Sequence, residues 1–376
     1  MLHPRDVQDL VQIVGDAAAS GNKLEIVGGG TRHDFGAPRD AMPVSMAALS
    51  GVIEYDPAEL VLTLRGGTPL SDVLALIEGE GQMLAFEPWG ADGSTIGGIV
   101  AAGVAGSRRV TAGSVRDHLL GFSAVSGRGE VIVAGAKVVK NVTGYDLPKL
   151  MAGSWGRLGA VTELTLKVLP KPRVTATMMA RGVSLRSAHA AMACALGSNL
   201  EVSAAAYLQN GDLLLRIAGF APSVEARCRV LPTVMKGHGE LLLAPEDEVA
   251  HGWHQAMTGQ GLSGDVCWQV HLPPRHAHDL IESLSPLDIA WAMDWGGGRV
   301  WIITGSVKEE VRVAASRFGG EARLVRAPAE MRASIPAFQP RQQGVMMLEH
   351  RVRQAFDPFG VFATDRFRED AYANQL

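Results

Sequence analysis

The sequence predicts an α+β protein made of two unlike parts and a short C-terminal segment. Two observations lead to this prediction. Short apolar strands alternate with long glycine-rich loops up to residue 170, and beyond it one order of helices and strands occurs twice. Pro170 and Pro172 end the last strand of the first part. A chain of 376 residues is long enough for two domains, which we place at 1–171 and 172–330, with the C-terminal segment at 331–376.

The first part is expected to open with a helix over residues 4–20. Pro4 suits a first helical turn, and Gly21 ends the helix. Four apolar residues share one face of it: Val7, Leu10, Val11 and Val14. A strand over 24–27 then runs into three consecutive glycines.

Further elements of the first part follow from local patterns. Residues 60–65 predict a strand, and Ser71 is expected to cap a helix that ends at Gly79, with Val73, Leu74 and Ile77 facing inward. Residues 122–135 predict a β-hairpin that turns at Gly127-Arg128-Gly129. Residues 159–170 alternate as a half-buried strand, and the segment 87–121 between these elements is rich in glycine and has no sustained periodicity.

The second part has the element order β-α-β-β-α-β twice, over residues 173–243 and 265–326. The first half has helices at 185–196 and 224–235 and a hairpin turning at Asn210-Gly211. The second half has helices at 276–284 and 308–318 and a hairpin turning at Gly296-Gly297-Gly298. We therefore predict a duplicated ferredoxin-like α+β cap with one shared sheet. The chain from Pro340 onward predicts a helix that ends near Phe356, and then a short loop.

Composition excludes several classes of function. The formal charge of −4 is mixed in sign and no basic stripe carries aromatic residues, so nucleic acid is not an expected partner. We expect no transmembrane segment and no signal peptide, because no apolar stretch is long enough for either. Cys194, Cys228 and Cys267 are far apart, which argues against disulfides, metal sites and iron–sulfur clusters. We expect a cytoplasmic protein whose electron carrier, if it has one, is organic.

The stretch "IVGGGTRHDFG", residues 26–36, matches neither of the common phosphate-binding motifs. His33 stands where the dinucleotide fingerprint needs its third glycine, and no Gly-Lys-Ser/Thr closes the loop as a Walker A motif would. Taken alone, the triplet is equally consistent with a turn that binds nothing. Four glycine-rich stretches together are stronger evidence for a phosphate-binding site than the triplet alone: 28–31, 94–98, 103–107 and 153–159. Grouped backbone N–H groups in such turns bind a pyrophosphate without a lysine.

The order of five stretches resembles the FAD-binding domain of the vanillyl-alcohol oxidase/PCMH flavoprotein family. They are "IVGGGT", "GSTIGGIVAAGVAG", "GSVRDHLLG", "KNVTGYDLPKL" and "GSWGRLGAVTELTLKVLP", and the likeness covers roughly the first 170 residues. The "DPFGVF" tail is similar to that family's C-terminal return segment. Within the family, the last two stretches most resemble the FAD-binding subunits of bacterial glycolate oxidase (glycolate dehydrogenase).

The resemblance implies a two-subdomain FAD-binding domain, the cap, and a C-terminal segment that returns to the FAD domain. It implies FAD as cofactor, with the first glycine loop and residues 95–103 around the pyrophosphate and the backbone of residues 160 and 161 at the adenine. The implied cofactor-binding residues are Gly28, Gly29, Gly30, Thr31, Arg32, His33, Ser94, Thr95, Ile96, Gly97, Gly98, Gly103, Gly106, Ser107, Gly156, Gly159, Ala160 and Val161.

The resemblance also implies a function within a complex. The chain would bind FAD and relay electrons from a catalytic FAD-containing glycolate oxidase subunit to an iron–sulfur subunit, and would not be catalytic alone. Through these partners it could lie at the inner face of the cytoplasmic membrane. Two alternatives stay open: a free-standing sugar- or alditol-type oxidase, and a flavin-free assembly subunit.

Hydroxy-acid oxidation needs a base, because the hydroxyl proton must leave as hydride is taken from the alcohol carbon. His271, His276 and His278 in "HLPPRHAHD" lack the glycine-framed histidine motif of relatives that oxidise hydroxy acids, and we interpret them as surface residues. The same holds for Glu349-His350. No catalytic residue and no metal site is predicted. In place of the Asn-Pro-Gly-Arg usual in relatives, the tail has Ala363-Thr364-Asp365-Arg366, which puts its flavin contact in doubt.

Other candidates have a structural and a functional interpretation each. Arg116 and Asp117 could pair on the surface or close the loop under the flavin, and the first is favoured. Tyr145 and Asp146 could contact the flavin or fix a turn. Cys194 is expected in the core, and packing is favoured for the predicted cluster of Trp291, Trp295 and Trp301.

His33 raises one question about the cofactor. Gly30-Thr31-Arg32-His33 matches the Gly-x-x-His spacing at which some free-standing oxidases of the family attach FAD covalently. Attachment needs a neutral imidazole, and the neighbouring Asp34 favours the charged form. We therefore predict non-covalent FAD.

Overall fold

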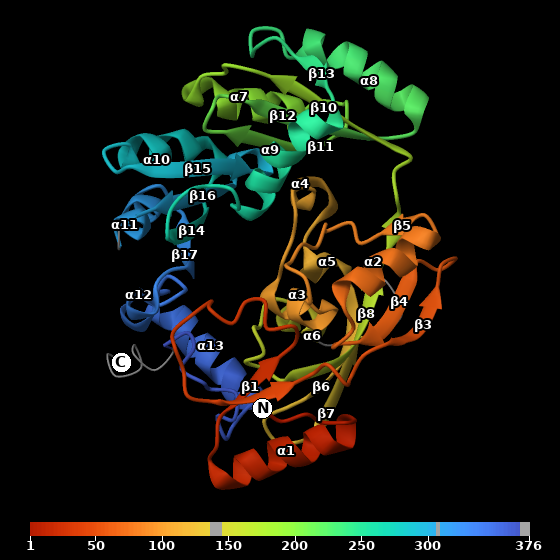
Figure 1. The fold of residues 1–376 in the computed structure, drawn as a ribbon, viewed down its shortest axis with the longest axis vertical. Helices are drawn as coiled ribbons and strands as arrows, with labels where there is room; N and C mark the ends of the chain where they lie inside the picture. The colour runs from red at the N-terminus through yellow and green to blue at the C-terminus, as the bar shows by residue number, and fades with distance from the viewer. Residues whose placement is uncertain (136–144, 306–308, 369–376) are drawn as a thin grey trace.

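The computed structural model describes residues 1–135, 145–305 and 309–368. Two groups of elements stand one above the other in Figure 1. The lower group, here called the N-terminal part, consists of residues 1–170, and the upper group, here called the cap, of residues 174–326. Each has its own hydrophobic cores, so the predicted α+β class is confirmed.

The first helix is shorter than predicted. Helix α1 spans Val7–Ser20, because the Asp6 side chain accepts a hydrogen bond from the Asp9 N–H at 2.9 Å and so begins the helix there, after Pro4. Gly21 ends it in the left-handed conformation (φ 75°), as predicted. Strand β1 (Leu24–Val27) follows and pairs in parallel with β2 (Met42–Ser45).

A five-stranded antiparallel sheet forms the rest of the N-terminal part, in the order β3-β4-β8-β6-β7. Its strands are β3 (Val52–Asp56), β4 (Val61–Arg65), β8 (Ala160–Lys167), β6 (Leu119–Val125) and β7 (Val131–Gly135). The predicted hairpin is β6–β7, in which Val125 pairs with Val131. A shared core packs helices α2 (Leu70–Gly79) and α3 (Ile96–Ala102) on the sheet.

Two predictions for α2 were wrong. Pro69, not Ser71, occupies the cap position, because the helix already begins at Leu70. Leu74 is exposed, so the buried face of α2 is formed by Leu70, Val73 and Ile77. Short elements complete this part: α4 (Arg109–Ala112), α5 (Val115–His118), α6 (Leu147–Met151), and the paired strands β5 (Gln82–Met83) and β9 (Leu169–Pro170).

The cap contains the predicted elements in the predicted order. Its first half is β10 (Val174–Ala180), α7 (Leu185–Leu196), β11 (Val202–Leu208), β12 (Leu213–Gly219), α8 (Ala221–Val234) and β13 (Leu242–Ala244). Its second half is β14 (Val266–His271), α10 (Ala277–Leu284), β15 (Ile289–Asp294), β16 (Arg299–Thr304), α11 (Glu310–Arg317) and β17 (Glu321–Arg326), with single 3₁₀ turns at Pro274–His276 and Trp295–Gly297. One eight-stranded sheet results, in the order β13-β10-β12-β11-β15-β16-β14-β17.

The two faces of the cap sheet are covered differently. Helices α7, α8, α10 and α11 bury one face in the largest core, around Trp268 and Ile302. Helix α9 (Glu246–Thr258), which the sequence analysis did not predict, packs Val249, Trp253 and Ala256 on the other face. Gly252 and two histidines interrupt its apolar pattern, which explains why periodicity did not reveal it.

The C-terminal segment comprises α12 (Ala329–Ser334) and α13 (Gln343–Phe356), of which only α13 was predicted. After α13, the Asp357 carboxylate accepts hydrogen bonds from the N–H groups of Val361 (2.8 Å) and Phe362 (2.7 Å). The Val361 carbonyl in turn accepts one from the N–H of Leu24 in β1, so this segment packs against the N-terminal part. Across the described residues, the search finds no helix with the length and apolar character needed to cross a membrane.

Candidate functional site

Three of the four glycine-rich stretches meet around one small pocket of about 110 Å³, here called the cradle. The predicted residues that line it are Gly28, Gly29, Gly30, Thr31, Arg32, His33, Ser94, Thr95, Gly97, Gly98, Gly156, Gly159 and Val161. The cradle adjoins a cavity of about 1050 Å³ between the N-terminal part and the cap, and residues 30–33 line both. Gly103 lines the large cavity only.

Glycine is required in the cradle because its loops touch one another. A Cβ on Gly28 would lie 2.2 Å from the Thr95 hydroxyl oxygen, and one on Gly29 only 1.7 Å from the Gly93 carbonyl oxygen. Gly30 has a different requirement, since its φ of 68° is left-handed. The Thr31 and Ser94 hydroxyls, 3.1 Å apart, join the first loop to the second.

Four predicted cofactor residues line neither pocket. Ile96 and Ala160 are buried in the cores. Ser107 donates a hydrogen bond to the Asp294 carboxylate at 2.7 Å, and the Gly106 carbonyl accepts one from the Trp295 indole at 2.9 Å. The stretch 103–107 therefore joins the N-terminal part to the cap beyond Gly103, which corrects its assignment as a cofactor loop.

Arg32 is a cation without an opposite charge. Burial lowers the pKa of its guanidinium to about 10. The guanidinium lies 5.1 Å from the centre of the Trp89 ring and donates to the Trp89 carbonyl, and within the described ranges it makes no ion pair. Partly burying a lone cation costs free energy unless an anion joins it. The cradle is thus suited to an anionic group such as a pyrophosphate.

The tail reaches the cradle in spite of its unusual sequence. Arg366 lines the pocket and donates hydrogen bonds to the carbonyls of Phe35 (2.7 Å) and Arg32. Its guanidinium lies 3.6 Å from the Glu25 carboxylate, and burial lowers its pKa to about 10. Arg366 therefore holds the first glycine loop in place.

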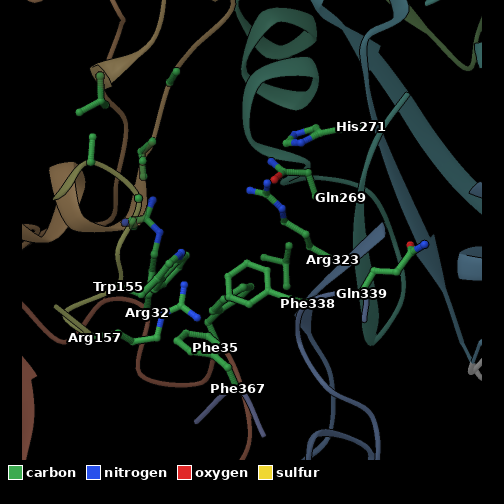
Figure 2. A pocket seen from close by; sticks show the side chains of 18 of the residues that line it. Arg32, Phe35, Trp155, Arg157, Gln269, His271, Arg323, Phe338, Gln339 and Phe367 are labelled. Atoms are coloured by element: carbon green, nitrogen blue, oxygen red, sulfur yellow. The ribbon is translucent and has the colours of Figure 1, made fainter. Parts of the chain in front are cut away.

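An aromatic cluster that sequence reasoning missed forms one wall of the cavity. Phe35 and Trp155 stack with ring centres 4.3 Å apart, and Phe338 and Phe367 complete the group. Figure 2 shows these four side chains together, drawn from segments far apart in the chain. Trp155 has a left-handed φ of 57°, a strained conformation for a tryptophan that is typical of functional sites. In the sequence, the only indication of this backbone conformation is the glycines near Trp155 in "GSWGRLG".

The opposite wall is the exposed face of the cap sheet. Alternate residues of β14 point into the cavity, namely Cys267, Gln269 and His271. Burial and the nearby guanidiniums of Arg323, Arg299 and Arg109 hold the pKa of His271 well below its usual value, so the imidazole is neutral. Its Nε2 atom is buried and has no hydrogen-bond partner in the described structure. The interpretation of His271 as a surface residue was therefore wrong.

Of the other predicted histidines and acids, His276 and His278 do not line the cavity, whereas Glu349 and His350 do. His276 pairs with Asp279 at 2.9 Å, and His278 lies 3.2 Å from the same carboxylate, both partly exposed. Glu349 and His350 are on α13 at the rim of the cavity, where Arg341 lies 3.5 Å from Glu349. Over the residues that the structure describes, no cluster of three metal-ligating side chains is found.

The predicted tryptophan cluster does not exist. Trp291 packs in the helix-covered core against Tyr207, whereas Trp295 and Trp301 line the cavity from the other face. Cys194 packs, partly buried, at the edge of that core.

The remaining candidates have structural roles. Asp117 accepts hydrogen bonds from the N–H and hydroxyl of Ser114 and caps α5, while Arg116 is an exposed residue that lines the cavity. Asp146 caps α6 by accepting a hydrogen bond from the Lys149 N–H, and the Tyr145 side chain is 92% exposed. The first five residues of "KNVTGYDLPKL" lie outside the described residues.

The cavity is strongly basic, although the whole chain is slightly acidic. Its acidic lining residues, among those described, are Asp34 and Glu349. Its arginines are Arg32, Arg109, Arg116, Arg157, Arg299, Arg323, Arg326, Arg341, Arg351, Arg353 and Arg368. Charges of one sign that line a cavity with low-dielectric walls attract ligands of the opposite sign.

Comparisons with known proteins agree with this geometry. The family model described as an FAD binding domain matches residues 1–135. The fold resembles the solved structure of an alkyldihydroxyacetonephosphate synthase, with a TM-score of 0.70 at 14% identity over 96% of this chain and 74% of that one. The cradle, the family model and the fold define this protein as an FAD-binding flavoprotein.

Sequence relatives identify the family more closely. The chain is 33% identical to glycolate oxidase subunit GlcE of Escherichia coli (strain K12) over 96% of both chains. It is 30% identical to glycolate oxidase subunit GlcD of Bacillus subtilis (strain 168), over 48% of this chain and 39% of that one. It is 35% identical to D-lactate dehydrogenase of Anaerostipes hadrus, over 41% and 31%. The chain belongs to the GlcE family of glycolate oxidase subunits.

Proposed function

We propose that this chain is the FAD-binding subunit of a glycolate-oxidising complex, and that it relays electrons from a catalytic flavoprotein subunit to an iron–sulfur subunit. The observation that carries the proposal is the full-length match to a protein named glycolate oxidase subunit GlcE. The cradle supports it, because three glycine-rich stretches meet there beside Arg32, a partly buried cation without an ion pair in the described structure.

The residues of the cradle suit the parts of FAD. Gly28 to Thr31 and residues 95–98 would hold the pyrophosphate, with the charge of Arg32 beside it. Gly156, Gly159 and Val161 would hold the adenosine end. Bound FAD would supply an acceptor of two electrons that can pass them on singly. The chain alone is not expected to sustain turnover, because its natural electron acceptor is another subunit.

The relay can be tested in the assembled complex with Arg32→Glu. A carboxylate in place of the guanidinium would face the pyrophosphate, so this subunit should lose most of its flavin. In rapid mixing, glycolate should still reduce the flavin of the catalytic subunit, but reduction of the iron–sulfur subunit should slow at least about tenfold. The control is Arg229→Glu on α8, where the arginine side chain is 76% exposed. Unchanged electron transfer in a complex without flavin in this chain would favour the assembly role instead.

We further propose that the cofactor is held without a covalent bond. The His33 side chain is 66% exposed and its Nδ1 atom lies 3.4 Å from the Arg39 guanidinium, an arrangement that a loop histidine adopts without any ligand. Acid denaturation followed by filtration should release all yellow colour, and His33→Ala should retain most of its flavin. Colour that stays with the denatured wild-type chain and is lost in His33→Ala would identify a covalent link and favour a free-standing oxidase.

We propose that the FAD-binding domain is 1–171, the cap 172–330 and the returning segment 331–376. The order of strands supports a duplicated ferredoxin-like cap, since the two halves contribute four adjacent strands each in mirrored order. We also propose that the chain is cytoplasmic and that its partner subunits hold it at the inner face of the membrane. Fractionation of cells that express the whole complex tests this location.

A further inference from the structure

We infer that Gln269, His271 and Arg323, on the cavity wall of the cap sheet, form a binding site for a small 2-hydroxy carboxylate in this subunit itself. The inference rests on the proposed function, because it names a ligand for the cavity beside the flavin site. It differs from the sequence-based expectation, in which the cap has no residues that bind or oxidise a hydroxy acid.

The three side chains converge because of strand register. Gln269 of β14 pairs with Arg323 of β17, and His271 follows two residues later, so all three lie on the same face of the sheet. Figure 2 shows them on one wall, across the cavity from Trp155 and Arg157. The opposite face of the same strands carries Trp268 and Val270, which are fully buried in the core.

Polar atoms of this wall are left without partners. The Nε atom of Arg323 and the Nε2 atom of His271 are both buried and make no hydrogen bond to a described residue. Buried polar atoms without partners are rare in native proteins, and each calls for an explanation such as a bound ligand. One Nη atom of Arg323 donates to Glu321 at 2.9 Å, which fixes the direction of the guanidinium and leaves Nε for a ligand.

The charges point to an anion. Arg109 reaches the cavity from the N-terminal part, stacks on Trp295 at 4.2 Å, and repels the guanidinium of Arg323. Arg109 has no ion pair with any residue that the structure describes, whereas Arg323 is paired with Glu321 at 2.9 Å. An anion between the two guanidiniums would give Arg109 a counter-charge and reduce their mutual repulsion. A guanidinium binds a carboxylate through parallel hydrogen bonds, and Gln269 adds amide donors.

The neutral imidazole adds selectivity for a hydroxyl group. A neutral histidine has one ring nitrogen that accepts a hydrogen bond, and an α-hydroxyl can donate to it while the carboxylate lies on Arg323. A simple carboxylate such as acetate lacks that donor. The site should therefore prefer glycolate to acetate, although both carry the same charge.

Calorimetric titration of the purified chain with glycolate and with acetate tests the site, with the flavin spectrum recorded in parallel. The wild type should bind glycolate about tenfold more tightly than acetate. Arg323→Gln should weaken both by about 10- to 100-fold, whereas His271→Phe should weaken glycolate alone and abolish the preference. Bleaching of the flavin by glycolate also counts as binding.

Arg326→Gln is the matched control, since Arg326 lies on the same strand and lines the same cavity but donates to the Gly264 carbonyl. Its affinity for glycolate should stay within about twofold of the wild type. Equal weakening in Arg323→Gln and Arg326→Gln, no preference for glycolate, or no binding would overturn the site. A chain that binds flavin but no carboxylate refutes this inference alone, whereas a chain without flavin refutes the proposed function.

Discussion

Replacing Asp294 with alanine is expected to destabilise the protein by about 3–5 kcal/mol. The Asp294 carboxylate and the Arg299 guanidinium form an ion pair at 2.6 Å with side chains that are 0% and 1% exposed. Burial raises the pKa of Asp294, but Arg299, the Ser107 hydroxyl and the Trp295 N–H all favour the ionised form, which we assign. Without this carboxylate, a fully buried cation would lose its counter-charge.

The effect should be seen in thermal unfolding. For a domain of this size the loss corresponds to a fall in the melting temperature of roughly 6–20 °C. The control is Glu282→Ala, which removes the ion pair between Arg186 and Glu282, of similar length (2.7 Å) but with side chains 74% and 38% exposed. That change should cost less than about 1 kcal/mol. Similar melting temperatures for the two variants would show that the buried pair does not stabilise the contact between the two parts.

The same pair also positions the cap over the cavity. Arg299 donates to the Ala105 carbonyl at 3.0 Å, and Ser107 donates to Asp294, so both partners of a cap ion pair are bonded to one loop of the N-terminal part. A second ion-pair group, of Glu87 with Arg108 and Arg216, crosses the same boundary. We therefore expect the cap to stay fixed on the N-terminal part rather than to open as a lid.

Elements with local signals could be predicted from the sequence. The hairpin β6–β7 turns at its two glycines, and the cap elements follow alternation, helical periodicity and turn chemistry, all within windows of a few residues. The glycines of the cradle could be found for the same reason. The high glycine content of each loop is by itself enough to predict that its backbone approaches another group closely.

Residues defined by contacts between distant segments could not be predicted. Ser107 and Asp294 are 187 positions apart, and no local pattern connects them. His271 was interpreted as a surface residue because no glycine-framed histidine motif surrounds it, yet its side chain lines the cavity between the two parts. A better signal was the alternation in "VCWQVH", which places Gln269 and His271 on the face opposite Trp268 and Val270.

Trp155, Glu87 and Trp295 show a second limit. All three adopt left-handed backbone conformations with φ between 48° and 57°, which turn rules assign to glycine or asparagine. Each is held by tertiary contacts instead: Trp155 by stacking on Phe35, Glu87 by two arginines, and Trp295 by a hydrogen bond from its indole to the Gly106 carbonyl. All three lie on or beside the cavity, where strain of this kind concentrates.

The largest effect on the cofactor is expected from Gly29→Ala. The new Cβ would lie 1.7 Å from the Gly93 carbonyl oxygen and 2.6 Å from its carbon, both backbone atoms that cannot rotate away. The first and second glycine loops would have to separate, which would open the cradle. We expect flavin affinity to fall at least about 100-fold, measured as the ratio of flavin to protein absorbance after gel filtration.

Comparison with Gly29→Asp separates packing from charge. If the steric clash of the added Cβ is sufficient to open the cradle, the Gly29→Ala and Gly29→Asp variants should lose flavin to the same extent. The repulsion between the aspartate and the pyrophosphate would then add nothing, because the cradle is already open. The matched control is Gly15→Ala in α1, where a Cβ meets no atom within 4 Å and should leave flavin content unchanged. Circular dichroism of each variant reports whether the chain still folds. A folded Gly29→Ala chain with full flavin would mean that contact between the loops does not form the cofactor site, and that the arginines beside it hold FAD instead.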